Sequence, residues 1–227
     1  MCTHFTATHN DAWVKKSLGV GLPPAGSYDQ EVFPTYRAPL ARLGEDGRVR
    51  VEAARFGLIP HWAKDATIGR RTYNARTETV ADKPSYRTPW RQQQLGVCLL
   101  DTFYEPNWES GRAEKWGLRL ATQDPMGVAC LWDKWVDPAT GEVVLSFSML
   151  TVNADGHPVM GRFHRPADEK RSVVLLHPDT FMRWLTPEGD KSGFLACPNH
   201  TLLLGEPLTQ TEQPPDPGPV TTQHELF

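Results

Sequence analysis

The feature that most constrains this chain is a series of apolar runs of strand length that no regular succession of helices separates. Two such runs cover residues 95–105 and 143–152, and a shorter one covers 171–176. Apolar runs of this length between turn residues indicate buried strands. Because strands and helices do not alternate regularly, a parallel sheet of βαβ units is not favoured. The sequence predicts an α+β fold with a mostly antiparallel, curved or barrel-like sheet and a few short flanking helices.

Turn residues are frequent, with twenty prolines and eighteen glycines in 227 residues. In the segment 41–59, Glu45-Asp46-Gly47 separates two strand-like runs, of which the second alternates apolar and polar residues. This pattern predicts two strands joined by a tight turn. The segment 115–136 is predicted to form a hairpin that turns near Asp124-Pro125.

Helix signals are few and short. Asn10 is a suitable N-cap for a helix that Gly19 would end. Residues 85–94 have helical potential that Pro89 is expected to interrupt, and residues 177–185 resemble a terminal helix. The predicted helices are therefore minor elements beside the sheet.

The chain reads as one domain followed by a tail. No internal linker and no repeat divides residues 1–200, so we assign them to a single domain. Residues 201–227 include the stretch QTEQPPDPGPVTTQ and are predicted to be a Pro-rich, poorly structured or extended tail.

Charge and tryptophan content limit the kinds of partner. The formal net charge is −3, so binding to a nucleic acid would have to come from a local basic patch. The eight tryptophans fit either core packing or stacking on bases, and composition does not separate the two. The start of the chain has no apolar signal-peptide core, and no run is long enough for a membrane helix. We expect a cytoplasmic, monomeric protein without membrane contact.

The cysteines do not form a recognisable framework. Cys2, Cys98, Cys130 and Cys197 are far apart and form no C-x-x-C motif, which fits a reducing compartment. Cys197 and His200 are separated by two residues, and without a second pair of that spacing they make a poor zinc site. We therefore predict neither a metal nor another cofactor.

Cys2 directly follows the initiator methionine, and removal of Met1 would leave a free cysteine at the amino terminus. Its amine could form a Schiff base with an aldehyde, and its thiol could then close a five-membered thiazolidine ring. An α-amine with a pKa of about 7.7 is neutral several hundred times more often at pH 7 than a lysine with a pKa of about 10.4. The thiol is partly ionised, and proximity would speed ring closure. Cys2 could equally be an ordinary second residue.

Three further segments of the chain contain residues that could carry chemistry. Asn74 and Arg76 lie in the segment TYNARTET, where Arg76 could contact a phosphate or a base. Glu105 ends an apolar strand beside aromatic residues, which suits a carboxyl group with a raised pKa that acts as an acid or base. His164 lies between two arginines in a setting suited to an anionic ligand, and His157 competes for the same role. Each could instead be a surface or turn residue.

The order of these features along the chain resembles one known family. MC at the start, FGLIPHWA, NARTET, a strand that ends in FYE, and a late histidine followed by arginine and an apolar strand resemble the SRAP family of SOS-response-associated peptidases, also called abasic-site processing proteins. The resemblance extends from residue 2 to about residue 185. NARTET and FYE are its most specific segments.

The resemblance implies a function and a site. It implies an SRAP domain with a positively charged groove for single-stranded DNA and a thiazolidine link between the terminal cysteine and an abasic site. In this chain the crosslinking nucleophile would be Cys2. Asn74 would orient the cysteine, Glu105 would act as acid and base in Schiff-base formation, and His164 would assist sugar-ring opening and reversal.

The same resemblance implies that Trp62 and Arg76 belong to the DNA-binding face, and that residues ahead of the cysteine are removed by a peptidase activity. Two departures stand out. The family usually continues M-C-G-R, whereas Thr3 and His4 follow Cys2 here. The family's late motif is commonly H-x-R-M-P, whereas the insert RPADEK separates His164 from Arg171 here, so either Arg165 or Arg171 could take the place of the family's arginine.

Three functions are therefore in view. The first is a covalent sensor of abasic sites in single-stranded DNA, associated with the nucleoid when bound. The second is an amino-terminal-nucleophile cysteine hydrolase, in which Cys2 and either His164 or Glu105 cleave peptides or amides. The third is a non-covalent module for single strands, which would tolerate replacement of Cys2 whereas the other two would not.

Overall fold

The computed structural model describes residues 1–208, apart from the side chain of His200. Its strands are β1 (Phe5–Ala7), β2 (Glu31–Val32), β3 (Arg37–Leu43), β4 (Val49–Phe56), β5 (Asn74–Arg76), β6 (Leu95–Asn107), β7 (Glu114–Leu120), β8 (Met126–Val136), β9 (Val143–Asn153), β10 (Arg171–Val173), β11 (Leu175–Leu176) and β12 (Leu203–Pro207). Its helices are α1 (Asp11–Leu18), α2 (Arg87–Arg91) and α3 (Phe181–Leu185), with the 3-10 turns η1 (Ala66–Arg70), η2 (Met160–Arg162), η3 (Pro178–Thr180), η4 (Ser192–Phe194) and η5 (His200–Leu202).

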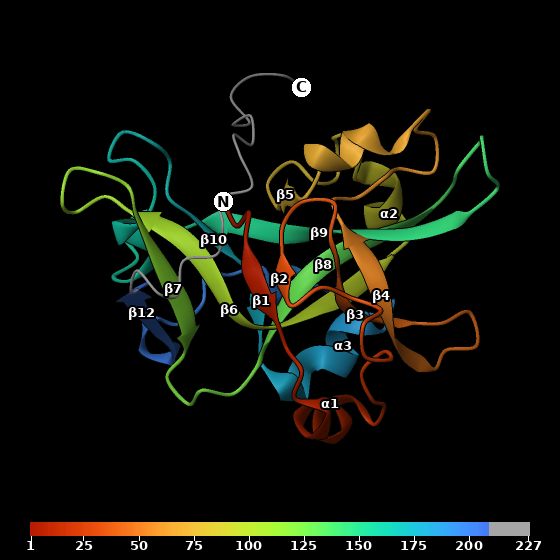
Figure 1. The fold of residues 1–227 in the computed structure, drawn as a ribbon, viewed down its shortest axis with the longest axis horizontal. Coiled ribbons are helices and arrows are strands. Elements are labelled where there is room, and N and C mark those ends of the chain that lie inside the picture. Colours follow the sequence, from red (N-terminus) through yellow and green to blue (C-terminus); the bar gives the residue numbers. More distant parts are fainter. Residues whose placement is uncertain (209–227) are drawn as a thin grey trace.

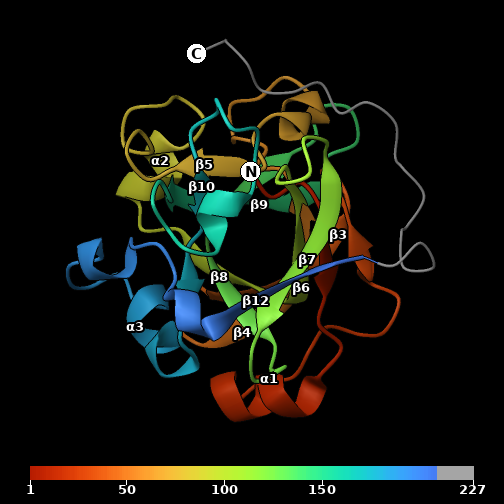
Figure 2. The same cartoon turned by 90° about the vertical axis from the view of Figure 1, so that its left-hand side faces the viewer.

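The sheet closes on itself. Strands β8, β9, β4, β3 and β6 are neighbours in that order, and β6 also pairs with β8, which completes a ring. Most pairs are antiparallel, whereas β4 and β5 each pair in parallel with β9. Figure 2 shows these strands around the centre of the molecule, and Figure 1 shows the short helices at its periphery. The predicted α+β fold with a barrel-like sheet is confirmed.

Both faces of the central strands are buried, which explains the uninterrupted apolar runs in the sequence. On β6, Cys98 and Leu100 belong to one core cluster together with Phe56, Phe103 and Phe147 of the barrel. The intervening residues of β6 belong to a second cluster, which the helices cover. Alternate residues of a strand point to opposite faces. A strand with two buried faces therefore loses the alternation of polar and apolar residues.

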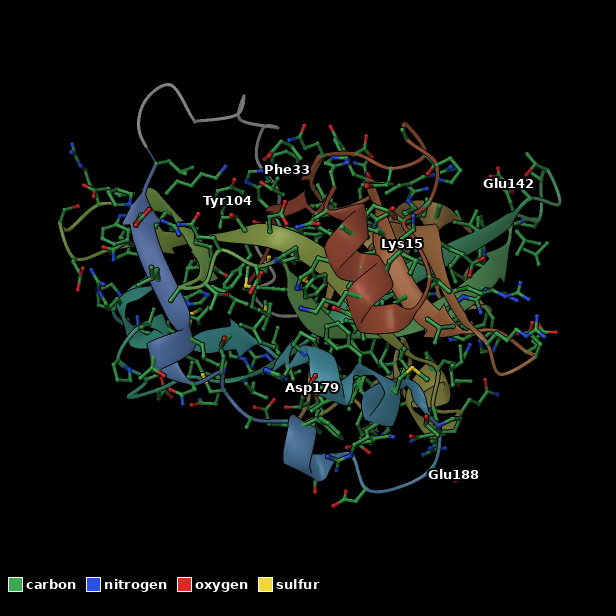
Figure 3. All side chains as sticks on the ribbon, turned by 90° about the horizontal axis from the view of Figure 1, so that it is seen from below. Lys15, Phe33, Tyr104, Glu142, Asp179 and Glu188 are labelled. Atoms are coloured by element: carbon green, nitrogen blue, oxygen red, sulfur yellow. The ribbon has the colours of Figure 1, made fainter. Side chains whose placement is uncertain are left out.

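Helix α1 begins and ends where its capping residues predict. The side chain of Asn10 accepts a hydrogen bond from the backbone N–H of Trp13 at 3.0 Å, and Gly19 has the left-handed φ of 73°. Trp13 packs edge-on against Phe181 of α3, so the two helices cover the same side of the sheet. Figure 3 shows this side, with Lys15 on α1 and Asp179 just before α3.

The expected interruption at Pro89 is wrong. Helix α2 continues through Pro89, because the residue lies in the first turn, where a backbone N–H has no intrahelical acceptor. The predicted helix at 177–185 is present as the turn η3 followed by α3.

The segment 41–59 forms the predicted pair of antiparallel strands β3 and β4. The predicted hairpin at 115–136 is wrong, because β7 and β8 do not pair with each other. Strand β6 is 13 residues long, and β8 pairs with its first half while β7 pairs with its second half. Strands β7 and β8 are consecutive in sequence, but they pair with different halves of β6 and not with each other.

Strand β12 pairs with β7, so the sheet continues past the predicted boundary at residue 200. The rest of the predicted tail, residues 209–227, lies outside the described residues. Within residues 1–208, no helix is long and apolar enough to cross a membrane.

Candidate functional site

The amino terminus is carried into the barrel by β1. This strand pairs with β6 on one side and with β2 on the other, and its Phe5 packs edge-on against Phe56 with ring centroids 5.2 Å apart. Cys2, three residues earlier, is 0% exposed and belongs to the inner core cluster. Its thiol donates a weak hydrogen bond to the carbonyl of His4, with Sγ 3.5 Å from the oxygen. The second residue is therefore part of the fold and not a loose terminus.

The terminal α-amine meets two of the predicted residues. The ammonium group of Met1 donates to Oε2 of Glu105 at 3.3 Å and also contacts Nε2 of His164. Nε2 of His164 lies 3.3 Å from the same carboxylate oxygen. An amine, a carboxylate and an imidazole thus share one small site, which we call the amine site.

The carboxylate of the amine site is buried but ionised. Burial alone would raise the pKa of Glu105, which is 3% exposed, but the positive α-amine and the hydrogen bond from His164 outweigh burial and lower it. Glu105 can therefore accept a proton from the amine beside it. The raised pKa predicted for this residue is wrong, because a strand-end position does not reveal the positive charge of the chain terminus.

The expectation that the thiol of Cys2 is partly ionised is wrong, because the structure buries the thiol. Burial, followed by the negative charge of Glu105, raises the pKa of Cys2 well above its ordinary value. Burial also raises the pKa of the neighbouring Tyr73 to about 12, with Glu105 and Cys2 adding to the effect. Both groups are held in their protonated forms.

Asn74 holds the main chain of the cysteine. It lies on β5, which pairs in parallel with β9, and its Nδ2 donates to the carbonyl of Cys2 at 2.7 Å. Its backbone carbonyl accepts the hydroxyl of Tyr86 at 2.9 Å. Its buried Oδ1 has no hydrogen-bond partner among the described residues, which leaves one acceptor available in the site.

His164 is held by its own loop. Its φ of 66° is unusual for a residue other than glycine, its N–H donates to the carbonyl of Pro106, and Nζ of Lys170 donates to its carbonyl at 3.1 Å. Lys170 also donates to the carbonyl of Arg165 at 2.7 Å. The last residue of the insert RPADEK therefore fastens the turn that carries the imidazole.

His157, the alternative to His164 in the sequence, does not lie in the amine site. Nδ1 of His157 accepts the backbone N–H groups of Val159 and Met160 at 3.1 and 2.9 Å, and its Nε2 contacts the carbonyl of Pro198. His157 shapes its own loop, and His164 is the histidine of the amine site.

The predicted arginines do not meet at the amine site. The guanidinium of Arg171, which is 2% exposed as a residue, donates to Glu78, Glu169 and the carbonyl of Thr151. Arg76, which like Asn74 lies on β5, pairs with Glu169 at 2.8 Å. We call these four charged residues the Arg171 cluster, and its two guanidinium groups already have carboxylate partners.

The other two predicted contacts are on the surface. Arg165 is exposed, and its guanidinium lies over the ring of Trp108 at 5.4 Å. Trp62 is 50% exposed. Both side chains are accessible to a ligand.

Sequence reasoning missed Tyr73, Lys170 and His4. The ring of His4 stacks between Phe33 and Tyr104, each at 4.2 Å, and its Nε2 bonds to Glu31 at 2.5 Å. The departure from the family pattern marked His4 as unusual, but nothing in the sequence signalled the contacts of Lys170. Among the described residues, no cluster of three or more His, Cys, Asp or Glu side chains could hold a metal ion.

Comparisons with known proteins agree on one relationship. A family model described as SOS response associated peptidase (SRAP) matches residues 1–202. The chain is 29% identical over 178 residues to the abasic site processing protein YoaM of Bacillus subtilis, an alignment that covers 76% of this chain and 73% of that protein. It is 28% identical over 168 residues to the abasic site processing protein HMCES of Xenopus tropicalis, covering 62% of this chain and 46% of that protein.

Solved structures show the same likeness. A crystal structure of a protein from Bordetella bronchiseptica superposes with a TM-score of 0.81 at 28% identity, covering 92% of this chain and all of that one. A protein from Bacteroides thetaiotaomicron superposes with a TM-score of 0.77 at 20% identity, covering 95% and 97%, and shows the likeness of fold alone.

Proposed function

This chain belongs to the SOS response associated peptidase (SRAP) family, and from that premise we propose that it traps abasic sites of single-stranded DNA on its own amino terminus as a thiazolidine. Relatives named abasic site processing proteins support an action on abasic sites. We propose that the protein acts as a monomer and needs no metal or other cofactor.

One observation carries the proposal. A carboxylate and an imidazole, from strands and loops far apart in sequence, both contact the α-amine of the chain terminus. The neighbouring residue is a cysteine whose thiol is close enough to Glu105 for its pKa to respond to that charge. The amine that the two groups contact is that of Met1. We propose that removal of Met1 leaves the Cys2 amine beside the same two groups, which would unite the amine, the proton acceptor and the thiol that thiazolidine chemistry requires.

The chemistry starts from a terminus at Cys2. After removal of Met1, the Glu105 carboxylate takes a proton from the cysteine ammonium, and the neutral amine attacks the C1′ aldehyde of the ring-opened sugar. Glu105 returns the proton to the resulting hydroxyl, which leaves as water and gives a protonated imine, and the imine proton then passes back to the Glu105 carboxylate. The thiol then adds across the C=N bond: Sγ bonds to carbon and its proton goes to nitrogen. Aldehyde, amine and thiol thus become a thiazolidine and one water.

The remaining residues take supporting roles in this proposal. Asn74 orients the cysteine through its carbonyl, and His164 assists sugar-ring opening and reversal of the adduct. Trp62, Arg76 and Arg165 belong to the DNA-binding face. Between the two candidate arginines of the late motif, we assign the DNA contact to Arg165, because the guanidinium of Arg171 is buried and engaged.

The hydrolase alternative has less support. An amino-terminal cysteine hydrolase acts through a thiolate, whereas burial holds the thiol of Cys2 in its protonated form. Removal of Met1 by the chain itself remains part of the proposal, in keeping with the family description. It predicts loss of Met1 from the purified protein without an added aminopeptidase.

The test is the intact mass of the protein after incubation with abasic single-stranded DNA. Protein that begins at Cys2 should gain the mass of the oligonucleotide minus one water, in an adduct that survives heat and denaturant without reductant. The Cys2→Ser variant should form an adduct that is largely lost unless borohydride traps it. A form with Met1 irreversibly retained should form none, because its α-amine lies one residue from the thiol.

An oligonucleotide without the lesion is the control and should add no mass to any form. A Met1-retaining form that crosslinks as well as the mature protein would show that the thiazolidine mechanism is wrong. Neither the thiazolidine mechanism nor the cysteine hydrolase mechanism predicts normal amide turnover by the Cys2→Ser variant.

A further inference from the structure

Three arginines converge at one end of the β3–β4 pair. Arg37 at the start of β3 and Arg55 near the end of β4 are directly opposite each other in the antiparallel register. Arg70 ends the turn η1, which lies against the end of β4: a Cβ built on Gly57 would be only 2.1 Å from the carbonyl oxygen of Gly69. This backbone contact brings Arg70 beside Arg55. We call Arg37, Arg55 and Arg70 the arginine patch.

The positive charge of the patch is largely uncompensated. Among residues 1–208, no carboxylate is within ion-pair distance of Arg55 or Arg70, and Arg37 has only Glu142, at 3.9 Å. The Nε of Arg55 is buried without a hydrogen-bond partner. Burial, and then the charges of Arg37 and Arg70, lower the pKa of Arg55. Like charges opposite each other destabilise a sheet, so an anion would relieve this arrangement.

A row of rings extends from Tyr36, the residue before Arg37, to His4, which is two residues from Cys2. Tyr36 is 44% exposed, and its ring lies edge-on to Phe33 at 5.7 Å. Phe33 stacks on His4, two residues from Cys2, and Tyr104 covers the other face of that histidine. Figure 3 shows Phe33 and Tyr104 close together.

We propose that the arginine patch binds phosphate groups of the DNA strand that flanks the lesion, with Tyr36 as a stacking surface for a base. Guanidinium groups pair with phosphate oxygens through two parallel hydrogen bonds, and an exposed aromatic ring beside basic groups is typical of surfaces for single strands. This inference rests on the proposed function and adds the path of the flanking strand to it.

The test is the salt dependence of binding to a lesion-free, fluorescently labelled single strand, followed by anisotropy. Each phosphate contact on a single strand contributes about 0.7 to the slope of log K against log salt. The Arg37→Gln/Arg70→Gln variant should therefore reduce the slope by about 1.4, and Arg70→Gln alone by about 0.7. Both side chains are exposed, so the fold should tolerate the changes.

The matched control is Arg48→Gln/Arg50→Gln, which removes the same charge from the opposite end of the same strand pair. It should keep the wild-type slope. An unchanged slope in the patch variant, or an equal loss in the control, would overturn the proposal.

A separate measurement distinguishes this proposal from the proposed function. A short abasic oligonucleotide with one nucleotide on either side of the lesion should crosslink to the patch variant as fast as to the wild type at saturation. Absence of any adduct with the wild type would contradict the crosslinking function, whereas the salt slopes would still decide the patch.

Discussion

The amine site and the Arg171 cluster both contain a carboxylate whose pKa is lowered by a positive partner, yet they suit different purposes. In the Arg171 cluster, the hydrogen bonds from Arg171 lower the pKa of Glu78 to about 2. In the amine site, the partners of Glu105 are an α-amine and His164. A guanidinium keeps its proton in proteins, whereas ammonium and imidazolium groups can give one up. Whether the partner can release a proton therefore decides whether an ion pair can support chemistry or only the fold.

The largest expected difference between the two sites concerns crosslinking. Glu105→Gln should slow adduct formation by about 10²-fold or more, because the amide cannot take the proton of the ammonium, while DNA affinity stays the same. Glu78→Gln should leave the rate unchanged. Single-turnover formation of the adduct with an abasic oligonucleotide, resolved on denaturing gels, measures both rates. Equal effects of the two substitutions would remove the distinction between the sites.

For the free energy of unfolding, the larger effect is expected in the Arg171 cluster. Arg171→Met should lower the free energy of unfolding by about 2 kcal/mol, because Glu78 and Glu169 lose a buried partner but remain partly hydrated. The exposed Arg76→Met should change it by no more than about 0.5 kcal/mol. Urea denaturation of both variants gives the comparison. The folded Arg171→Met protein should still crosslink at the wild-type rate, and a slower rate would place Arg171 in the reaction.

Two adjacent residues sharpen the contrast. Lys170 donates hydrogen bonds to the backbone carbonyls of His164 and Arg165, whereas the next residue, Arg171, belongs to the Arg171 cluster. Lys170→Met should reduce the crosslinking rate roughly tenfold, since small displacements of catalytic groups are costly, and should lower stability by about 1 kcal/mol or less. Lys170→Arg should restore part of the rate. A rate unaffected by Lys170→Met would show that the turn positions His164 without this lysine.

The smallest expected effect is a pH dependence of stability. The pKa of Glu78 is lowered from 4.5 to about 2 in the folded protein. Its ion pair with Arg171 therefore contributes fully above about pH 4.5 and is lost as the pH falls towards 2. Because Glu78 is half exposed, the contribution should stay below about 1 kcal/mol. Denaturation of wild type and Glu78→Gln across this range should show their difference shrinking on acidification, and a constant difference would exclude this pair as its source.

Local signals in the sequence predicted the elements that local contacts build. The capping residues Asn10 and Gly19 define α1, and the turn at Asp46-Gly47 joins β3 to β4. Pairing between distant strands was beyond the reach of such signals. Strand β6 is one apolar run in the sequence, but it is long enough to pair with β8 along its first half and with β7 along its second half. The segment 115–136 therefore forms two separate pairings with β6 instead of the predicted hairpin.

The candidate site shows the same division. The motifs identified Cys2, Asn74, Glu105 and His164, and the geometry brings all four to the chain terminus. The sequence did not separate the charge states of these groups, because the pKa of Glu105 depends on a terminal amine more than a hundred positions away. Nor did the sequence show which of Arg165 and Arg171 is available to a ligand. In the structure, Arg171 pairs with the carboxylates of Glu78 and Glu169.

The contact between Gly57 and Gly69 has a consequence for the natural history of this surface. Gly57 has a φ of 112°, and a Cβ on it would collide with the backbone of Gly69, so both positions tolerate little besides glycine. A lineage that replaced either residue would push η1 away from β4 and carry Arg70 with it. Across diverging sequences, we therefore expect an arginine at the position of Arg70 to keep its place beside Arg55 only where both glycines are retained.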